Sequence, residues 1–331
     1  MAGAPSAAAG AASTLAWMFV SSALIIANKR VYASGFPYPM FVTGVGQLAS
    51  AAGGVVLGWL SGRRSRSLPP VGWILPTIGP LWAVTFLTMW MGNAAYLHLS
   101  VAFIQIFKAM TPAVTLVLAA VAGQERLSFA LFVSVMLIAL GTGGAAVLET
   151  GAPSWSVLGA ALFVGSSFTE AARVVGSQRL MTKHHFTSLE TLVYTSLPTA
   201  ALLLAASLAF EGTGPLLLSA GTLEGAAAAL APFSRDLAYA AALSFAVNLS
   251  SFWAIASTGS LTFKVAGCLK NLAVIWYAVA VGREHVSGGQ LAGYAVSVAG
   301  FLIYTAAKSR AAADEARAAA KGKGRAKAKA Q

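Results

Sequence analysis

Ten apolar stretches, each long enough to cross a bilayer, constrain this chain more than any other feature of its sequence. About 20 residues of helix cross the ~30 Å hydrocarbon core of a membrane, where backbone groups must be satisfied within the segment. The chain is 57% hydrophobic and 10% charged, whereas soluble domains average about 25% charged residues. The sequence therefore predicts an all-α integral membrane protein with ten transmembrane helices. The predicted spans cover approximately residues 12–32, 38–60, 72–97, 100–122, 128–148, 154–178, 187–210, 236–257, 261–281 and 288–307.

The segments between these spans are mostly short and rich in Gly, Pro and Ser, which is typical of loops. We therefore expect a single ten-helix domain over residues 12–307, between a flexible N-terminus (1–11) and a basic tail (308–331). The loop from Glu211 to Arg235 is longer than the others and rich in Ala, Gly and Leu. It has room for an interfacial helix.

The positive charges are distributed unevenly between the two predicted sides of the membrane. If the N-terminus is cytosolic and the spans alternate, fourteen of the 22 Lys and Arg residues lie inside, four outside and four within spans. Eight of the inner cations belong to the tail from Lys308 onward. Because cytosolic loops of membrane proteins carry the excess of Lys and Arg, we predict that both termini are cytosolic. The net charge of +12 then needs no nucleic-acid partner.

The spans divide into two sets of five, over residues 12–152 and 153–307. The sequence GQERLS closes the fourth span and GREHVS closes the ninth, and a glycine-containing apolar span follows each. An odd number of spans in each half gives the halves opposite orientations in the membrane. We therefore predict an inverted five-plus-five repeat, with a solute site near the bilayer midplane between the halves.

Three lysines lie inside predicted spans: Lys108 in the fourth, and Lys264 and Lys270 in the ninth. A lysine near the bilayer centre costs roughly 2.5–3.5 kcal/mol on insertion scales, unless it faces protein or a water-filled cavity. Lys108 and Lys270 lie deep in their spans and have no acidic residue within a helical turn, so we predict that they bind an anionic solute. Lys264 either faces the same pathway or extends its long stem to the cytosolic interface.

Polar neighbours of these lysines extend the candidate site. Gln105 lies three residues before Lys108 and shares its helix face. Asn271 lies seven residues after Lys264 and projects in the same direction, whereas Lys270 points about 100° aside. Thr262 completes the polar set of the ninth span. Pro112 removes a backbone hydrogen bond from the fourth span and permits a kink that a moving gate could use.

In the sixth span, Glu170 and Arg173 are three residues apart and lie on one helix face. They form a structural ion pair within the helix in one interpretation. In the other, Arg173 faces the cavity and Glu170 holds it until an anion arrives. Further polar and aromatic residues in the spans suit either helix–helix contacts or recognition of the rings and hydroxyl groups of a solute: Asn93, Tyr96, Tyr194, Asn248 and Trp253.

Several classes of function find no support in the sequence. One cysteine, Cys268, excludes a disulfide framework and a cysteine-based zinc site. The four histidines have no metal-ligand spacing, and no nucleophile, zinc-protease or phosphate-loop motif occurs. We therefore expect no metal, no cofactor and no enzymatic activity. Glycine clusters such as ALGTGGAAV and GYAVSVAGFL suit close helix packing within the monomer, and the last span is a candidate face for a homodimer.

The segments WMGNAAYLHLSVAFIQIFKAMTPAV, FTEAARVVGSQRL and LTFKVAGCLKN resemble the triose-phosphate translocator and nucleotide-sugar transporter family, within the drug/metabolite transporter superfamily. The resemblance covers nearly the whole chain and is closest to plant and algal UDP-sugar-transporter-like members. It implies ten helices in an inverted repeat and exchange by alternating access. Nucleotide-sugar members import a nucleotide sugar into the Golgi or endoplasmic reticulum and export the nucleoside monophosphate.

By this resemblance, Lys108 and Lys270 stand at the two lysines that bind substrate phosphate. Plastid translocators place Lys-Arg where this chain has Lys270-Asn271, and a His at Gln105. The loss of that Arg weakens a sugar-phosphate interpretation, because bidentate phosphate binding is arginine chemistry. GDP-mannose transporters have Phe-Tyr-Asn-Asn in the seventh span, where this chain has Val-Tyr-Thr-Ser around Tyr194. UDP-sugars therefore remain the better prediction.

We thus predict a UDP-sugar antiporter of the Golgi or endoplasmic reticulum membrane. The C-terminal Lys-Ala-Lys-Ala-Gln fits a K-x-K-x-x signal, in which Lys327 and Lys329 would bind the coat that retrieves proteins to the endoplasmic reticulum. One alternative is a plastid-envelope antiporter that exchanges sugar phosphates or phosphoenolpyruvate for phosphate. The other is a membrane scaffold or receptor without transport.

Overall fold

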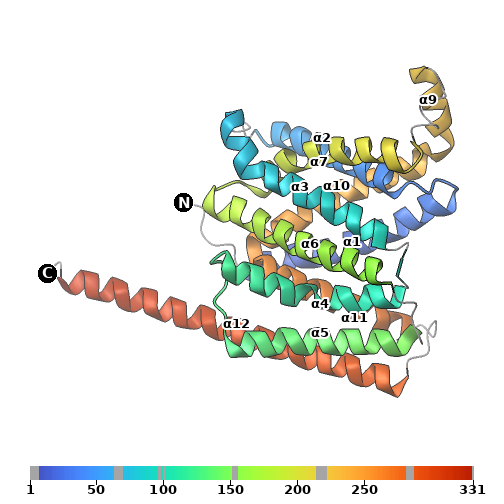
Figure 1. Ribbon diagram of the computed structural model, residues 1–331. Helices are drawn as coiled ribbons and strands as arrows, with labels where there is room; N and C mark the ends of the chain where they lie inside the picture. Colours follow the sequence, from blue (N-terminus) through green and yellow to red (C-terminus); the bar gives the residue numbers. More distant parts are fainter. Residues whose placement is uncertain are drawn as a thin grey trace. The chain divides into compact units, whose positions relative to one another are not determined.

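The computed structural model describes residues 7–62, 70–95, 98–99, 101–150, 156–213, 222–280 and 287–329. Within these ranges every regular element is a helix (Figure 1). The helices are α1 (Ala7–Ala33), α2 (Pro39–Leu60), α3 (Val71–Ala95), α4 (Val101–Val121), α5 (Phe129–Thr150), α6 (Val157–Lys183), α7 (Ser188–Phe210), α9 (Leu223–Leu230), the 3-10 turn η1 (Ala231–Phe233), α10 (Ser234–Thr258), α11 (Ser260–Ala280) and α12 (Gly288–Lys329).

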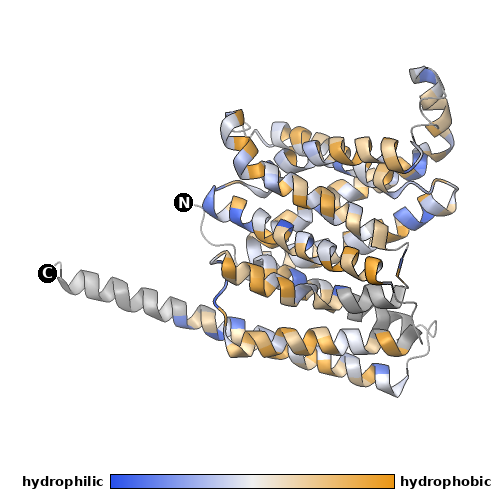
Figure 2. Cartoon of the chain, in the orientation of Figure 1, coloured by the Kyte–Doolittle hydropathy of each residue, from blue (hydrophilic) through white to orange (hydrophobic). Residues whose placement is uncertain are grey.

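The prediction of an all-α membrane protein is confirmed. Each of the ten predicted spans corresponds to a long helix, and the loop after α7 contains the short helix α9. Seven segments within the described ranges are long and apolar enough to cross a membrane, and shorter apolar stretches lie in α4 and α5. Apolar residues cover most of these helices (Figure 2). The inverted repeat, the division into halves 12–152 and 153–307 and the cytosolic termini stay predictions.

The chain forms two compact units. Unit 1 comprises residues 1–99 and 155–266 and contains α1, α2, α3, α6, α7, α9, α10 and the first turns of α11. Unit 2 comprises residues 100–154 and 267–331 and contains α4, α5, the rest of α11 and α12. Each unit draws helices from both predicted halves. The residue at which α11 passes from one unit to the other is Gly267, between Lys264 and Lys270.

In unit 1, helix pairs approach closely at glycines. A Cβ added to Gly44 of α2 would lie 2.9 Å from Leu204 of α7, and one added to Gly46 would lie 2.5 Å from the Ser244 hydroxyl of α10. The carboxylate of Glu211, which ends α7, accepts hydrogen bonds from the backbone N–H groups of Met40 (2.6 Å) and Phe41 (3.0 Å). A carboxylate at these unpaired donors satisfies the start of α2 and interacts favourably with its dipole.

In unit 2, α5 and α12 touch through their backbones. A Cβ added to Gly141 would lie 2.5 Å from the carbonyl oxygen of Gly293, and one added to Gly300 would lie 2.8 Å from that of Ser134. The hydroxyls of Thr142 and Ser297 share a hydrogen bond of 2.9 Å across the same contact. The prediction that these glycine clusters serve close packing within the monomer is thereby confirmed.

Candidate functional site

The two deep lysines of the sequence prediction both belong to unit 2. Lys108 lies on α4 with an exposed side chain, and Lys270 lies on α11 with a partly buried one. Although they are far apart in sequence, their ammonium groups lie within electrostatic range of each other. Two neighbouring cations in a region of low dielectric repel each other, and an anion of charge −2 placed against both relieves that repulsion. The fold therefore brings together the two side chains that the sequence singled out.

Four other predicted residues fall, wholly or by their side chains, outside the described part of the chain. The side chains of Asn93, Gln105 and Asn271 lie outside the described part of the chain, as does Tyr96 altogether. Their roles stay predictions. Pro112, one turn after Lys108, lies inside α4 and is buried.

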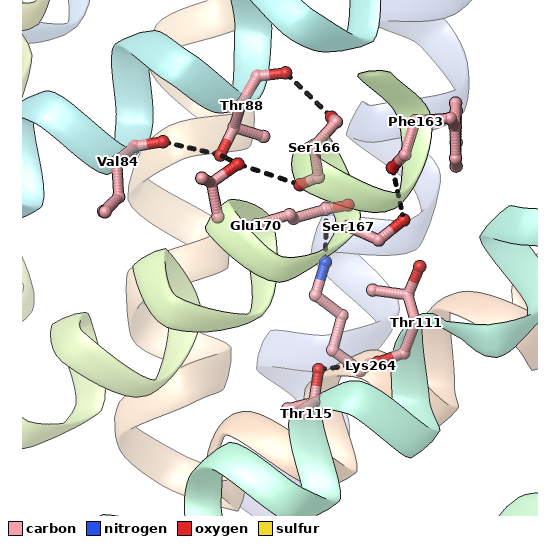
Figure 3. Close-up of polar contacts among 10 residues, drawn as sticks. Val84, Thr88, Thr111, Thr115, Phe163, Ser166, Ser167, Glu170 and Lys264 are labelled. Atoms are coloured by element: carbon pink, nitrogen blue, oxygen red, sulfur yellow. Dashed lines mark hydrogen bonds and ion pairs between the residues drawn. The ribbon is translucent and has the colours of Figure 1, made fainter. Parts of the chain in front are cut away.

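Lys264 belongs to unit 1 and forms an ion pair with Glu170 of α6 (Figure 3). Its side chain is only 11% exposed, so it does not extend to an aqueous interface as one interpretation held. Next to this pair, Thr88 of α3 donates a hydrogen bond of 2.9 Å to Thr169. The Ser166 hydroxyl donates another, of 3.0 Å, to the Thr88 carbonyl. These bonds fix α6 against α3 and so position Glu170.

The ion pair expected between Glu170 and Arg173 is therefore formed between helices instead, with Lys264 as the partner. Arg173 interacts with Glu170 at longer range. Its Nε is buried and has no hydrogen-bond partner within the described residues. The local spacing rule on which the prediction relied compares residues one turn apart, and it does not include a residue on another helix.

Arg173 lines a small polar cavity inside unit 1, with Gln47 of α2, Thr195 and Thr199 of α7 and Asn248 of α10. The cavity offers ≈ 10 Å³, which is room for about one water molecule. Asn248 donates hydrogen bonds to the Ser50 hydroxyl (2.9 Å) and to Gln47 Oε1 (3.5 Å). In this conformation Asn248 therefore joins α10 to α2, and the cavity is too small for a sugar or a base.

The remaining predicted residues lie apart from that cavity. The ring of Tyr194 packs edge-on against Phe186, with ring centroids 5.5 Å apart, and its backbone carbonyl accepts a hydrogen bond from Trp82. Trp253 is 48% exposed. Thr262 is partly buried near the start of α11. The structure does not gather Tyr194, Asn248 and Trp253 into one pocket.

One residue that holds α11 in place was missed by the sequence prediction. Gln178 of α6 accepts a hydrogen bond of 2.6 Å from the backbone N–H of Ser260, the first residue of α11. The preceding residue, Gly259, separates α10 from α11 with φ of 86°, a left-handed conformation that suits glycine. Gln178 and Glu170 are eight residues apart on α6, so they lie on one face and hold the first two turns of α11. The quoted segment FTEAARVVGSQRL contains Gln178, but nothing in its spacing indicated a partner.

Within the described ranges, no group of three or more His, Cys, Asp or Glu side chains could hold a metal ion. The chemistry that these residues offer is charge neutralisation and hydrogen bonding in an apolar setting. Long apolar helices that carry lysines within them are typical of a multi-pass membrane protein.

Comparison with known proteins gives the family. The Triose-phosphate Transporter family matches residues 10–305, so the chain belongs to this family and is a transporter rather than an enzyme. A "Probable sugar phosphate/phosphate translocator" of Arabidopsis thaliana is 29% identical over 306 residues, covering 89% of this chain and 77% of that one. The "GDP-mannose transporter GONST5" of the same plant is 25% identical over 301 residues, covering 88% and 84%. A crystal structure superposes with a TM-score of 0.59 at 17% identity, covering 92% of this chain and 99% of the other, and shows a shared fold.

Proposed function

We propose that this protein exchanges a nucleotide sugar, with a UDP-sugar as our first choice, for a nucleoside monophosphate by alternating access. The observation that carries the proposal is the pairing of Lys108 and Lys270 on two helices of unit 2. Two lysines match the charge of a diphosphate, and such a pairing is favourable in a low-dielectric site only when charge and hydrogen bonds are both satisfied. A transporter relative described as carrying GDP-mannose supports a nucleotide-sugar substrate.

The structure changes the supporting roles in this proposal. Lys264 is neutralised by Glu170, so we assign the phosphate to Lys108 and Lys270. We keep Gln105, Asn271 and Thr262 as proposed orienting groups near these lysines. Tyr194 and Asn248 hold helices together in this conformation, and a contact between either residue and the solute would require a rearranged state.

A second candidate is the exchange of a sugar phosphate for inorganic phosphate. It is favoured by relatives described as probable sugar phosphate/phosphate translocators, which are 28–29% identical to this chain. Asn271 argues against sugar-phosphate exchange, because an arginine at this position would bind a single phosphate better, through two hydrogen bonds. Either solute would be bound by the same two lysines.

Exchange in proteoliposomes separates the candidates. Vesicles containing the purified full chain are loaded with UMP, GMP or phosphate, and the uptake of labelled UDP-sugars, GDP-mannose, triose phosphate and phosphoenolpyruvate is measured. We expect UMP-loaded vesicles to take up UDP-sugars. Uptake of a sugar phosphate into phosphate-loaded vesicles alone would establish the second candidate. The absence of exchange under every condition would favour a scaffold.

Variants test the assignment of the lysines. Lys108→Ala and Lys270→Ala are each expected to lower uptake by at least about tenfold, because each removes a charge-assisted contact of roughly 1.5–3 kcal/mol. Lys29→Ala removes an exposed lysine from α1 and is the matched control. Normal uptake by either deep variant would exclude that lysine from the site.

We further propose residence in the Golgi or endoplasmic reticulum, with both termini cytosolic. A fluorescent protein fused to the N-terminus leaves the tail signal intact. Changing Lys327 and Lys329 to Ser should move the fusion from the endoplasmic reticulum to later compartments if the signal is read. A plastid-envelope pattern would overturn this localisation, and protease protection of the N-terminal fusion in sealed microsomes would overturn the orientation.

A further inference from the structure

A cleft separate from the paired lysines runs along unit 1 between α3 and α6. It measures ≈ 470 Å³, within the ~300–1,000 Å³ typical of cavities that hold small ligands. Its apolar lining includes Pro76, Pro80 and Val84 of α3 and Ala172 and Gly176 of α6. Both helices are candidate membrane spans. The cleft therefore lies between two candidate membrane spans.

The amino-acid sequence explains why the two helices leave this space. Pro76 and Pro80 are four residues apart, so they share a helix face, and neither can donate a backbone hydrogen bond. On the facing helix, Ala172 and Gly176 are also four residues apart and carry almost no side chain. A Cβ added to Gly176 would come within 3.2 Å of Leu81. The result is an apolar groove with a floor of small or rigid residues.

One end of the cleft is cationic. Its polar side chains are Thr77, Arg179 and His184, and among the described residues no carboxylate lines it. The charges of Arg179 and of the exposed Lys183 both act on His184, so these cations converge at the end of α6. Burial and, secondarily, these charges lower the pKa of His184 below its ordinary value. The charge at this end therefore comes from Arg179 and Lys183.

Aromatic rings lie next to this cationic end. Trp73, near the start of α3, stacks on Phe186 with ring centroids 6.0 Å apart and an interplanar angle of 9°. The same ring meets His184 edge-on at 5.4 Å. Tryptophan is enriched where a span leaves the hydrocarbon core. The apolar part of the cleft therefore extends into the membrane from a cationic, interfacial mouth.

We propose that this cleft binds one anionic phospholipid, with an acyl chain along Pro76, Pro80 and Gly176 and the phosphate against Arg179 and Lys183. An apolar groove between two membrane spans is expected to hold an acyl chain, because water would find no hydrogen-bond partners there. Basic pockets between spans on the cytosolic side suit anionic head groups, and the distribution of charge in the sequence predicts that this end of α6 is cytosolic. The site does not depend on which solute the transporter exchanges.

The test measures lipid retained by the purified full chain. Delipidated protein is reconstituted with phosphatidylcholine alone or with phosphatidylserine or phosphatidylinositol phosphate added, and native mass spectrometry counts the lipids that stay bound. We expect one anionic lipid to be retained in preference to phosphatidylcholine. Arg179→Gln with Lys183→Gln should weaken that retention by on the order of tenfold, whereas Arg126→Gln with Arg310→Gln, two exposed cations of unit 2, should leave it unchanged.

A second variant separates the groove from a general attraction of charges. Ala172→Leu with Gly176→Leu fills the apolar part and keeps both cations, so it should also abolish selective retention while unfolding near the wild-type temperature. If the filled variant destabilises the fold, Ala172→Leu alone is used. Equal retention of phosphatidylcholine and anionic lipid by the wild type would overturn the proposal. So would full retention by the filled variants, or an equal loss in the control pair.

Discussion

Glu170 on α6 forms an ion pair with Lys264 on α11, 94 residues further along the chain. The Lys264 side chain is 11% exposed and that of Glu170 is 33% exposed. The pair as a whole is neutral, so the start of α11 carries less positive charge than its sequence suggests. Lys264 thereby differs from Lys270, on which the positive charge of another lysine, Lys108, acts.

Removing the carboxylate of this pair should show how much the ion pair contributes to the free energy of unfolding. Glu170→Gln leaves a largely buried ammonium group without its counter-charge, and we expect a loss of about 1–3 kcal/mol, between the values for exposed and buried pairs. Glu170→Gln combined with Lys264→Met should cost less than Glu170→Gln alone. Thermal unfolding in one detergent measures all variants, with Glu224→Gln, an exposed acid of α9, as control. Strictly additive effects would contradict the pairing.

Gln178 should matter for the start of α11. Gln178→Ala removes the acceptor for the Ser260 N–H and is expected to cost about 1 kcal/mol of unfolding free energy. Gln178→Glu keeps an acceptor and adds a negative charge at a helix N-terminus, so it should be close to neutral. The control is Thr182→Ala, which changes an exposed side chain one turn further along α6. Equal stability of Gln178→Ala and wild type would show that the bond contributes nothing.

Glu211 should stabilise α2 from outside that helix. Glu211→Ala removes hydrogen bonds to Met40 and Phe41, and we expect a loss of about 2 kcal/mol. Glu211→Gln keeps an acceptor without the charge and should lose about half as much. Chemical denaturation of the purified variants measures the difference. If Glu211→Gln and Glu211→Ala lose the same amount, charge rather than hydrogen bonding is responsible.

Gly141 and Gly144 make a matched pair on α5. Gly141→Ala places a methyl group 2.5 Å from the Gly293 carbonyl, so α12 must shift, and we expect a loss of roughly 1–3 kcal/mol or more. A Cβ at Gly144 meets nothing within 4 Å. Gly144→Ala should therefore be neutral or gain up to about 1 kcal/mol from helix propensity. The unfolding temperatures of the two variants measure this difference. Equal effects at both sites would contradict the close backbone contact between α5 and α12.

His184 should make unit 1 sensitive to mild acid. Burial and the nearby charges of Lys183 and Arg179 lower its pKa in the folded protein. The unfolded state then binds the proton more readily, so stability is full above pH ~6.5 and falls as the pH decreases below that value. His184→Gln should flatten the stability profile between about pH 7 and 5. His98→Gln, with an exposed side chain, is the control, and an unchanged slope in His184→Gln would exclude His184 as the source of the pH dependence.

The helices were predictable because the membrane imposes a length on each of them. The predicted span 38–60 and the helix Pro39–Leu60 agree to within one residue, and the loop after α7 holds a helix where its composition indicated one. The last helix is longer than its span, continuing to Lys329. An Ala- and Lys-rich tail has high helix propensity, but hydropathy alone does not report it.

The contacts between helices were much less predictable. The sequence identified Lys108 and Lys270, because a lysine within an apolar span is energetically costly unless it faces protein or a water-filled cavity. It predicted an ion pair between Glu170 and Arg173, because sequence spacing identifies only the neighbours that lie one helical turn apart. Partners such as Lys264, and the hydrogen bond from Ser260 to Gln178, depend on which helices pack together.

The backbone contact of α5 with α12 limits how unit 2 can change shape. Where side chains separate two helices, rotamer changes let the helices slide by small steps. At Gly141, Gly293 and Gly300 no such layer exists, so α5 and α12 are expected to move as one rigid body. Any gating within unit 2 then falls to α4 and α11. These are the two helices that carry Lys108 and Lys270, so an anion bound by both lysines, as we propose, would act directly on them.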